Sequence, residues 1–423
     1  MSTALLTDRY ELTMVQAALR SGKSERKTVF EVFTRNLPPG RRYGVFAGAG
    51  RLLSAIQEFE FEKPELEFLQ ANDIIDTETA SWLENFRFSG SILGYREGEL
   101  FFANSPVLRV EATFAEAVIL ETLILSILNY DSAVASAGAR MRFAAGNRYL
   151  AEMGARRANE HAAVAAARAA FIVGFDATSN LEAGRSYGIP TMGTSAHSFT
   201  LLHDTETQAF ESQIEVMGVD TTLLVDTYDV EKAVREAVRL TDGKIAAVRL
   251  DSGDLSVAAT RVRELLDSLG AKETKIVVTS DLDENTIAAL AAAPVDRYGV
   301  GTSLVTGSGH PTVGFVYKLV SHADGEKWVD VAKESRNKTN RGGKKNAARL
   351  IVDGVATAEL VGSQAEGRPL QVPLITNGLI DIAASGSAGV DAARNHHRNA
   401  LSELPAAAFR LSAGEPAIPT NFV

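Results

Sequence analysis

The sequence contains no cysteine among its 423 residues. Disulfide bonds, thiolate zinc sites and a cysteine nucleophile are therefore excluded. The chain also lacks an early apolar run behind a basic start, because Asp8, Arg9 and Glu11 interrupt the first turn, and this argues against a secretory signal. No stretch approaches the ~20 apolar residues that a membrane span requires. We therefore expect a cytoplasmic protein that has no membrane partner.

The chain has fewer positively charged than negatively charged residues. The 43 lysines and arginines are outnumbered by 53 aspartates and glutamates, which gives a net charge of −10. Because nucleic-acid binding needs a positive footprint, we expect no nucleic-acid partner. The net charge does not exclude binding of small anionic ligands at sites where several arginines lie close together. The 45% hydrophobic share and the 23% charged share are ordinary for a soluble globular protein.

Short apolar segments alternate with amphipathic helical segments in the middle of the chain. The segments that we predict as strands are 221–225, 245–250, 276–278 and 298–300. Asp229 and Asp254 stand where they would cap the helices after the first two strands, and a third helix is predicted to begin near Asp283. Such alternation predicts a parallel sheet. Each strand ends in polar or small residues, and in α/β barrels the active site lies at those carboxyl ends.

The predicted barrel covers residues 131–318. We interpret 172–173 and 191–192 as two earlier strands of the same sheet. Because this gives fewer clean strands than the eight of a regular barrel, we expect an irregular α/β barrel.

The first part of the chain, residues 1–130, predicts a smaller N-terminal α/β domain. Strand character is found at 28–35 and 100–112, and 115–130 is a long apolar helix candidate. Near its start, Asp8 is placed to cap a helix, with Glu11 completing a pair similar to a capping box. Tyr10 offers the alternative of stacking on an aromatic ring, although the sequence alone favours the cap.

The last part of the chain, residues 319–423, is more polar. Its basic segment 335–349 is typical of a solvated loop, with binding of pyrophosphate or triphosphate as the alternative. The glycines and serines of 385–389 predict a flexible break before a terminal helix.

Hydroxyl-bearing residues and glycines crowd into two short clusters, 177–184 and 193–198, with a turn signal at 187–190 between them. They offer backbone N–H and hydroxyl donors with little bulk, which suits phosphate oxygens. His197 lies in the second cluster, where a histidine can act as acid, base or nucleophile. A single histidine is more often structural, but these polar neighbours favour a function. A zinc site is disfavoured, because no second ligand stands at the required spacing.

Arg249 and Asp251 lie at the end of one predicted strand. Arg249 is suited to hold a ligand carboxylate, and Asp251 to accept hydrogen bonds from sugar hydroxyls or to bind Mg²⁺ through water. The alternative is that the two side chains pair with each other; their expected location at a strand end favours a function.

Two further groups suit phosphates. The glycine-rich strand end 299–303 is able to wrap a phosphate with backbone N–H groups, although glycines also permit tight turns. Arg156 and Arg157 offer adjacent guanidinium groups to a pyrophosphate, with a solvated surface as the alternative.

Seven motifs follow one another from Thr7 to about Arg349. They are TDRYELTM at 7–14, EMGARRA at 152–158, TSNLEAG at 178–184, GIPTMGTSAHSF at 188–199, VRLDSGDL at 248–255, VVTSDLDE at 277–284 and GVGTSLVTGSGHPTVGFVYKL at 299–319. Together they resemble the nicotinate phosphoribosyltransferase family. The resemblance implies a type II phosphoribosyltransferase fold, with an N-terminal α/β domain against an irregular, seven-stranded-like α/β barrel and a C-terminal segment that returns to the first domain. It also implies a homodimer in which Tyr10 reaches the partner's site.

The family joins nicotinate to 5-phosphoribosyl 1-pyrophosphate, giving nicotinate mononucleotide and pyrophosphate, and couples this reaction to ATP hydrolysis. The resemblance therefore implies ATP and Mg²⁺ as cofactors, with Mg²⁺ held mainly by pyrophosphate and water. It implies that ATP phosphorylates His197 and that Asp251 is a second catalytic residue. The substrate-binding positions that it implies are Tyr10, Arg156, Arg157, Asn180, Thr194, Arg249, Ser280, Asp281, Gly301 and Thr302.

Within that set, the resemblance implies three groups of roles. Tyr10, Thr194 and Arg249 match contacts to nicotinate. Gly301 and Thr302 match a contact to the ribose 5-phosphate. The remaining matches with a stated role are Asp251 and Asp281 on the ribose side, and Arg156 and Arg157 near the base and pyrophosphate.

Three competing interpretations remain at this point. A nicotinamide or quinolinate phosphoribosyltransferase would differ in its base pocket, and quinolinate, with two carboxylates, would call for more cations there. A barrel lyase or aldolase would want a lysine at a strand end for a Schiff base, whereas Lys275 precedes its strand. A sensor that binds phosphorylated metabolites without catalysis is the third.

Overall fold

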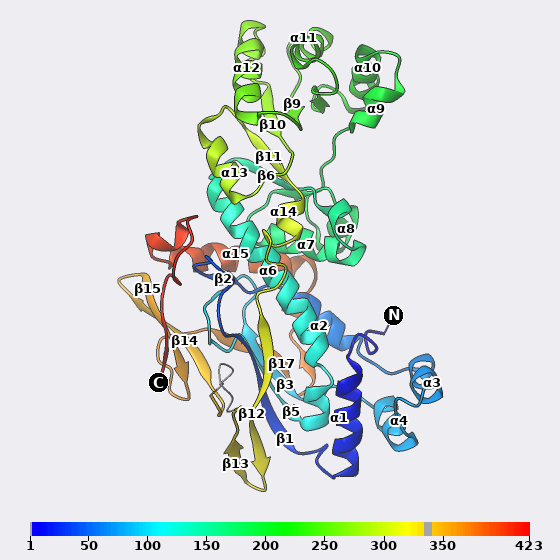
Figure 1. Cartoon of the computed structure of the whole chain (residues 1–423), viewed down its shortest axis with the longest axis vertical. Helices are drawn as coiled ribbons and strands as arrows, with labels where there is room; N and C mark the ends of the chain where they lie inside the picture. The colour runs from blue at the N-terminus through cyan, green and yellow to red at the C-terminus, as the bar shows by residue number, and fades with distance from the viewer. Residues whose placement is uncertain (1, 334–340) are drawn as a thin grey trace. The chain divides into compact units, whose positions relative to one another are not determined.

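The computed structural model describes residues 2–333 and 341–423. The chain forms two compact units: the first unit is Met1–Ser136 with His310–Val423, and the second unit is Ala137–Gly309. The second unit lies within the predicted barrel, 131–318, and both flanking segments of the chain lie in the first unit. Figure 1 shows the elements of each unit along the chain.

The second unit is built on a six-stranded parallel sheet in the order β7-β6-β11-β10-β9-β8. Its strands are β6 (Tyr149–Glu152), β7 (Ala177–Thr178), β8 (Thr222–Leu224), β9 (Ala247–Leu250), β10 (Lys275–Val278) and β11 (Arg297–Val300). The helices between them include α7 (Glu160–Ile172), α8 (Leu181–Tyr187), α9 (His197–Leu202), α10 (Glu206–Met217), α11 (Val230–Leu240), α12 (Leu255–Ser268), α13 (Glu284–Ala289) and α14 (Thr302–Val305). Because β7 and β8 are free edges, the sheet is an open, irregular α/β barrel, as predicted.

The two predicted helix caps of this unit, Asp229 and Asp254, are confirmed, and the helix predicted near Asp283 is capped by that residue. The Asp229 carboxylate accepts a hydrogen bond from the N–H of Lys232 at the start of α11. Asp254 does the same for α12, and Asp283 for α13. Each carboxylate satisfies an N–H group that the first helical turn leaves without a partner.

The predicted strand at 172–173 is wrong. Ile172 ends helix α7, Val173 is its C-cap, and the strand begins only at Ala177. A short apolar segment has the same sequence pattern at the end of a buried helix as in a buried strand. Here the alanine-rich helix α7 continues through Ile172, so no strand forms at this position. The predicted strand at 191–192 is reduced to one isolated parallel bridge between Thr191 and Thr178.

The first unit contains a seven-stranded antiparallel sheet in the order β13-β12-β1-β5-β3-β17-β18. The strands from the N-terminal part are β1 (Lys27–Thr34), β3 (Ser91–Tyr95) and β5 (Leu108–Thr113). Those from the C-terminal part are β12 (Phe315–Asp324), β13 (Lys327–Asp330), β17 (Gln371–Thr376) and β18 (Leu379–Ile380). The C-terminal segment therefore completes the N-terminal sheet, as the resemblance implied.

Two smaller sheets and several helices complete this unit. The sheets are β16-β14-β15-β19 and β2-β4, made of β2 (Gly44–Val45), β4 (Leu100–Phe101), β14 (Asn346–Val352), β15 (Val355–Gly362), β16 (Arg368–Pro369) and β19 (Thr420–Phe422). The helices include α1 (Arg9–Arg20), α2 (Ala49–Gln57), α3 (Lys63–Ala71), α4 (Thr77–Glu84), α5 (Phe114–Val118) and α15 (Gly386–Ser402); α6 (Glu121–Ala145) continues into the second unit.

The predicted apolar helix at 115–130 is longer than expected. Among the described residues, one helix, Phe114–Ala145, is long and apolar enough by length and composition to cross a membrane, so the expectation that no such stretch exists was too strict. Within its most apolar window, 67% is buried in the structure, which is the environment of a core helix.

The glycine-rich segment 385–389 is not a break. Ser385 is the N-cap of α15, and the helix begins at Gly386. A Cβ atom on Gly389 would lie 2.5 Å from the backbone of Ala384, so a glycine here permits the close approach of the preceding turn.

The start of α1 differs from the predicted capping box. Asp8 is the N-cap, but its side chain makes no cap hydrogen bond. The buried Glu11 carboxylate instead accepts hydrogen bonds from the N–H and hydroxyl of Thr122, at 2.8 and 2.6 Å, and so caps the start of α6. Burial raises the pKa of Glu11 to about 7.

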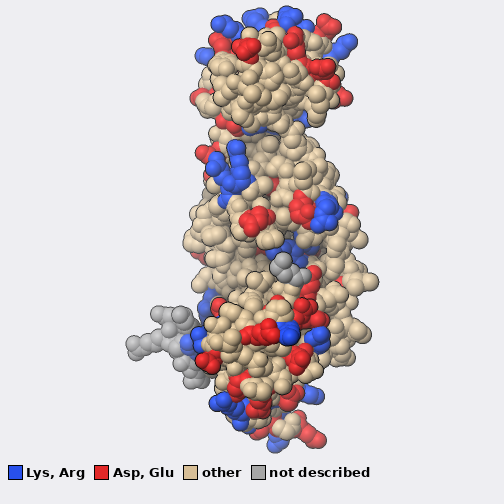
Figure 2. All heavy atoms as spheres, turned by 90° about the vertical axis from the view of Figure 1, so that its right-hand side faces the viewer, with Lys and Arg blue, Asp and Glu red and all other residues tan. Residues whose placement is uncertain are grey.

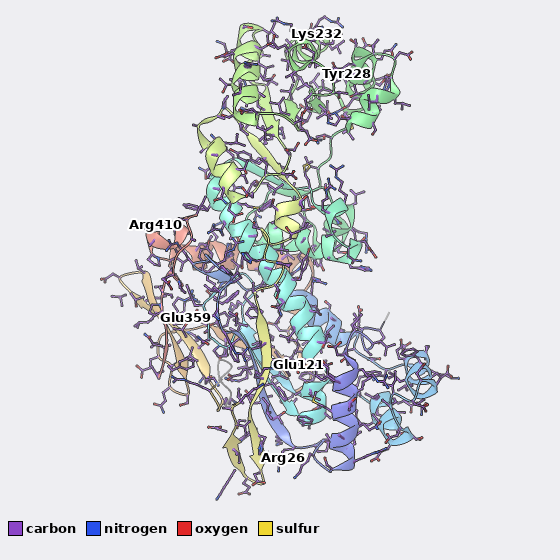
Figure 3. The ribbon with its side chains drawn as sticks, in the orientation of Figure 1. Arg26, Glu121, Tyr228, Lys232, Glu359 and Arg410 are labelled. Carbon is purple, nitrogen blue, oxygen red and sulfur yellow. The ribbon has the colours of Figure 1, made fainter. Side chains whose placement is uncertain are left out.

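The basic segment 335–349 is not a solvated loop at its C-terminal end. Residues 334–340 lie outside the described residues, but Arg349 is fully buried. Its guanidinium group donates to the carboxylates of Glu359 and Glu99 and to the carbonyl of Leu100. Figure 3 labels Glu359, which comes from β15. Cross-strand pairing between β14 and β15 thus supplies the partner that makes burial of the arginine tolerable.

Charges of both signs mix on the surface drawn in Figure 2. Lysines and arginines alternate with aspartates and glutamates, including at the end of the second unit that carries α10, α11 and α12.

Candidate active site

A cleft of about 540 Å³ opens at the carboxyl ends of the strands of the second unit. Its lining includes nine of the residues singled out in the sequence: Arg156, Arg157, Thr194, Arg249, Asp251, Ser280, Asp281, Gly301 and Thr302. Parallel register explains the convergence, because Leu224 of β8 and Val277 of β10 are both paired with Arg249 of β9. The strands therefore end side by side, and the loops that follow them meet.

The Arg249 guanidinium is already held by protein groups. Its Nε donates to the Thr279 hydroxyl at 3.0 Å, and its Nη1 donates to the Thr194 hydroxyl at 2.8 Å and to the Ser195 carbonyl at 3.2 Å. Its Nη2 lies 3.2 Å from Asp251 Oδ2. Both predicted interpretations of Arg249 are therefore compatible: it pairs with Asp251, and it also lines the cleft with donor capacity remaining on Nη2.

His197 lies at the edge of this cluster, at the start of α9. Its Nε2 is 3.9 Å from Asp251 Oδ2, and its Nδ1 is 3.1 Å from the hydroxyl of Thr227. Asp251 therefore faces the Nε2 side of the ring, and Thr227 contacts the Nδ1 side. The imidazole is 40% exposed, so a large reagent can reach it.

Asp251 is the hub of the cluster. Its carboxylate faces His197 and Arg249 and accepts a hydrogen bond from Thr279. Its backbone N–H donates to Asp226 Oδ2 at 2.8 Å, which fixes the turn that carries it. Asp251 therefore links the guanidinium of Arg249 to the edge of the cluster where His197 lies.

The β10 and β11 loops are tightly constrained on the opposite side of the cleft. A Cβ atom on Gly299 would lie 2.4 Å from Met153 Sδ and 2.6 Å from Thr279 Cγ2, so only glycine fits. Ser280 has a positive φ of 112°, an unusual conformation for a serine that turns the chain toward Asp281. Close packing of these strand ends brings backbone polar groups to the cleft wall.

Arg156 and Arg157 lie in a short 3₁₀ turn after β6, with both side chains exposed. They are the cations that line the cleft together with Arg249. Two exposed guanidinium groups beside a concave surface are suited to bind phosphate oxygens bidentately.

A second cavity of about 300 Å³ adjoins the cleft and shares Met153, Thr194, Arg249 and Gly299 with it. Its lining combines Met192 and Met217, apolar side chains suited to a flat ring, with the charged residues Asp220 and Arg297. Arg249 therefore lies where this cavity meets the polar cleft.

Two predicted site residues, Asn180 and Tyr10, are not among the residues that line the cleft. Asn180 is the N-cap of α8, where its side chain accepts a hydrogen bond from the N–H of Ala183. Tyr10 belongs to α1 of the first unit and is 46% exposed. Burial raises its pKa to about 12, and the Glu121 and Glu11 carboxylates act in the same direction; Figure 3 labels Glu121 on α6.

The sequence did not single out three residues that build the site. Thr279 holds both Arg249 and Asp251, Thr227 contacts His197, and Asp226 fixes the Asp251 turn. Each follows a predicted strand directly, so position at a strand end was the available signal.

Within the described ranges, no group of three or more His, Cys, Asp or Glu side chains is arranged to hold a metal ion. The carboxylates of Asp251 and Asp281 line the cleft singly. Such a donor set fits a divalent cation that a phosphorylated ligand brings with it, rather than one held by protein ligands alone.

Comparison with known proteins decides the family. Residues 5–129 match the model of the nicotinate phosphoribosyltransferase (NAPRTase) N-terminal domain, and residues 149–365 match that of the nicotinate phosphoribosyltransferase (NAPRTase) family. The chain belongs to the nicotinate phosphoribosyltransferase family.

Relatives of the family cover nearly the whole chain. The chain is 52% identical to nicotinate phosphoribosyltransferase pncB1 of Mycobacterium tuberculosis over 99% of its own length and 95% of that protein. It is 39% identical to nicotinate phosphoribosyltransferase of Bacillus subtilis, over 83% of this chain and 74% of that one. Human nicotinic acid phosphoribosyltransferase has the same fold, with a TM-score of 0.82 at 23% identity and 98% coverage of both chains.

Proposed function

We propose that this protein is a nicotinate phosphoribosyltransferase, which acts in NAD biosynthesis. The reaction joins the pyridine nitrogen of nicotinate to C1 of 5-phosphoribosyl 1-pyrophosphate and releases pyrophosphate. Family membership supports it, and one structural observation carries it: Arg249, Asp251 and His197 form a single cluster at the mouth of a cleft lined by three arginines.

The position of Arg249 supports nicotinate as the base. The ring would occupy the second cavity, and its carboxylate would take the remaining donor capacity of Arg249 with help from Thr194. The pyridine nitrogen carries its own lone pair, so no strong general base is required. Quinolinate has a second carboxylate, and Arg297 in the lining of this cavity is a second cation, so the choice of nicotinate over quinolinate rests on family membership and on the product assay. Nicotinamide would leave Arg249 without a charged partner.

Arg156 and Arg157 support binding of the pyrophosphate, and the Gly301–Thr302 backbone supports binding of the ribose 5-phosphate. Bond cleavage at C1 builds positive charge on the ribose and negative charge on the leaving group, which arginines stabilise electrostatically. Mg²⁺ bound to the pyrophosphate would neutralise part of the same charge. Asp251 and Asp281 are the carboxylates that would hold it through water, and Asp281 with Ser280 would face the ribose.

ATP coupling is the finer part of the proposal. His197 Nδ1 would attack the γ-phosphorus of ATP and release ADP, and water would later cleave the N–P bond and release phosphate. Phosphorylation adds about 2 negative charges beside Asp251, which displaces that carboxylate and rearranges the arginines of the cleft. Asn180 remains a proposed substrate contact on the family resemblance alone, because its side chain caps α8 and its N–H donates to the Thr178 hydroxyl.

A homodimer is proposed with it, in which Tyr10 of one subunit completes the nicotinate pocket of the other. The exposed ring of Tyr10 on α1 supports a stacking role. Size measurement in solution by light scattering tests the dimer, and a monomeric mass in a fully active preparation would refute it.

The experiment is a product assay with 5-phosphoribosyl 1-pyrophosphate and nicotinate, nicotinamide or quinolinate, with and without ATP. Of the three bases, we expect only nicotinate to react, and its product is nicotinate mononucleotide. ATP should raise the rate of this reaction, and ADP should form in the same assay. His197→Ala should remove the stimulation by ATP and leave slow transfer without ATP. Turnover of quinolinate or nicotinamide in preference to nicotinate refutes the base assignment, and undiminished ATP stimulation of the His197 variant refutes the phosphohistidine.

A further inference from the structure

Glu152 is a buried carboxylate for which the proposed reaction has no use. It ends strand β6, and its side chain is only 1% exposed. Its Oε2 accepts a hydrogen bond from the Thr178 hydroxyl at 2.5 Å, and its Oε1 accepts one from the N–H of Gly154. Its electrostatic partners are those two donors and no cation among the described residues, and burial raises its pKa. A carboxylate buried without a cation is costly, so the two hydrogen bonds that it accepts are the contacts that offset this cost.

Glu152 contacts the loop that follows β6 through the N–H of Gly154. Gly154, which donates to the carboxylate, starts the 3₁₀ turn of Arg156 and Arg157, and the N–H of Arg157 donates to the Gly154 carbonyl at 2.8 Å. Fixing Gly154 therefore fixes the backbone that aims both guanidinium groups. The side chain of Glu152 itself does not line the cleft.

Two more loops meet at the same point. The Glu152 carbonyl accepts a hydrogen bond from the N–H of Ser179, which follows β7 and lines the cleft. A Cβ atom on Gly154 would lie 3.0 Å from the Gly301 carbonyl and 3.1 Å from Glu152 Oε1, so the β11 loop packs directly against this turn. The Glu152 side chain thus joins Gly154, at the start of the arginine turn, to Thr178 at the end of β7. The bond to Ser179 is made by the backbone of Glu152, and the β11 loop packs against Gly154.

We propose that Glu152 is a positioning residue for the phosphorylated donor: it holds the arginine turn and the facing loops in the arrangement that binds pyrophosphate. This inference rests on the proposed function. The turn that its side chain holds carries Arg156 and Arg157 and packs against the Gly301 carbonyl. The carboxylate pocket of Arg249, in contrast, is held by Thr279, Thr194 and Ser195 and does not depend on Glu152. Loss of the carboxylate should therefore weaken the donor side and spare the base side.

Substitutions of Glu152 distinguish the effect of its hydrogen bonds from the effect of its negative charge. In Glu152→Gln the amide oxygen keeps the Gly154 N–H bond, and the amide N–H₂ donates to the Thr178 hydroxyl, which rotates to accept it. Glu152→Ala loses both contacts, and Thr178→Val removes only one of them while keeping the volume. Asp229→Ala is the matched control, because it removes a helix cap in the same unit whose contacts do not touch these loops.

The measurements are the separate KM values for 5-phosphoribosyl 1-pyrophosphate and nicotinate, and the calorimetric Kd for inorganic pyrophosphate with Mg²⁺. For Glu152→Ala we expect the donor KM and the pyrophosphate Kd to rise about tenfold, the equivalent of one lost hydrogen bond of about 1.4 kcal/mol, with the nicotinate KM within about threefold. Thr178→Val should show a smaller rise of the same kind. Glu152→Gln should stay within about threefold of the unsubstituted enzyme in every constant, and Asp229→Ala should change stability only.

Three results would overturn the inference. They are an unchanged pyrophosphate Kd in Glu152→Ala, equal changes on the donor and base sides, or a Glu152→Gln variant as impaired as Glu152→Ala. If Glu152→Ala does not fold, Glu152→Gln and Thr178→Val carry the same test. Failure of the unsubstituted enzyme to make nicotinate mononucleotide would instead remove the proposed function, and this inference with it.

Discussion

Replacement of Arg349 by methionine is expected to destabilise the first unit severely. The arginine is fully buried and is the cation that Glu359, also fully buried, contacts. Glu99 lies 3.1 Å from the same guanidinium but keeps Arg368 at 2.8 Å and His396 at 2.9 Å. The substitution therefore leaves the carboxylate of Glu359 buried without a counter-ion.

Breaking a buried ion pair on one side costs about 3–5 kcal/mol. For a unit of this size each kcal/mol lowers Tm by roughly 2–4 °C, so we expect a fall of about 6–20 °C. Arg368→Met is the matched control: this arginine is 28% exposed, and Glu99 keeps Arg349, so we expect a loss of only about 1 kcal/mol. Thermal unfolding followed by circular dichroism measures both.

The sign of the pH dependence is a second check. Burial raises the pKa of Glu359, and Arg349 opposes that shift, so removal of the arginine raises the pKa further. A group whose pKa is higher in the folded state contributes stability at low pH, which is lost as pH rises through that pKa. The loss in free energy of unfolding caused by Arg349→Met should therefore be larger at about pH 8 than at about pH 5.

A second substitution tests the cause. Glu359→Gln combined with Arg349→Met removes the buried charge and should recover about 2 kcal/mol of the loss. If Arg349→Met costs less than about 1 kcal/mol, or if the double variant is no more stable than the single one, the buried carboxylate is not the source of the destabilisation.

Three further substitutions bear on the site and on the helix that carries Tyr10. Asp251→Asn removes the carboxylate that faces His197 and should lower kcat/KM of the ATP-coupled reaction about 100-fold, with the uncoupled rate falling less; equal losses in steady-state assays would contradict this. Gly299→Ala drives a Cβ atom into Met153 Sδ and should cost about 1–3 kcal/mol in denaturant unfolding, whereas an unchanged midpoint would show that the loop adapts. Glu11→Gln removes a group whose pKa is about 7 when folded, above its unfolded value, so the loss of stability of the unsubstituted protein between about pH 5 and pH 7 should flatten in the variant; a parallel slope would contradict it.

In the second unit, the sequence correctly predicted the helix starts, because a single capping residue determines where each helix begins. Asp229, Asp254 and Asp283 each cap a helix within three residues of chain, and no distant contact competes with that geometry. The strand at 172–173 failed because an apolar dipeptide carries no period, and the continuation of helix α7 decides its structure.

Distant pairing explains what the sequence could not reveal in the first unit. Arg349 looked like part of a solvated basic segment, because its partners Glu99 and Glu359 come from other strands. Glu11 had the spacing of a capping box, yet it reaches Thr122 across more than a hundred residues. Both side chains match a local pattern, and in both a tertiary contact of lower free energy replaces it.

The site followed from a single topological rule rather than from any one motif. Parallel strands bring their carboxyl ends together, so Thr194, Gly301 and the Arg249–Asp251 end of β9 converge although they come from three separate parts of the chain. The rule predicts neighbours but not side-chain geometry, and the pairing of Arg249 with Thr279 was therefore not visible. The same rule is silent on Tyr10, which belongs to the first unit.

The charge of the cleft explains how an acidic protein can select anions. Arg156, Arg157 and Arg249 line it against Asp251 and Asp281, a local excess of positive charge in a chain of net charge −10. The Arg249 guanidinium is fixed by neutral acceptors before any ligand arrives, so its side-chain entropy is already lost and a carboxylate meets a preorganised donor. Asp251 competes with that carboxylate, and a phosphoryl group on His197 would repel Asp251 from the pair. Such a shift would strengthen the hold of Arg249 on the ligand at the moment of coupling, which gives ATP a direct route to the base site.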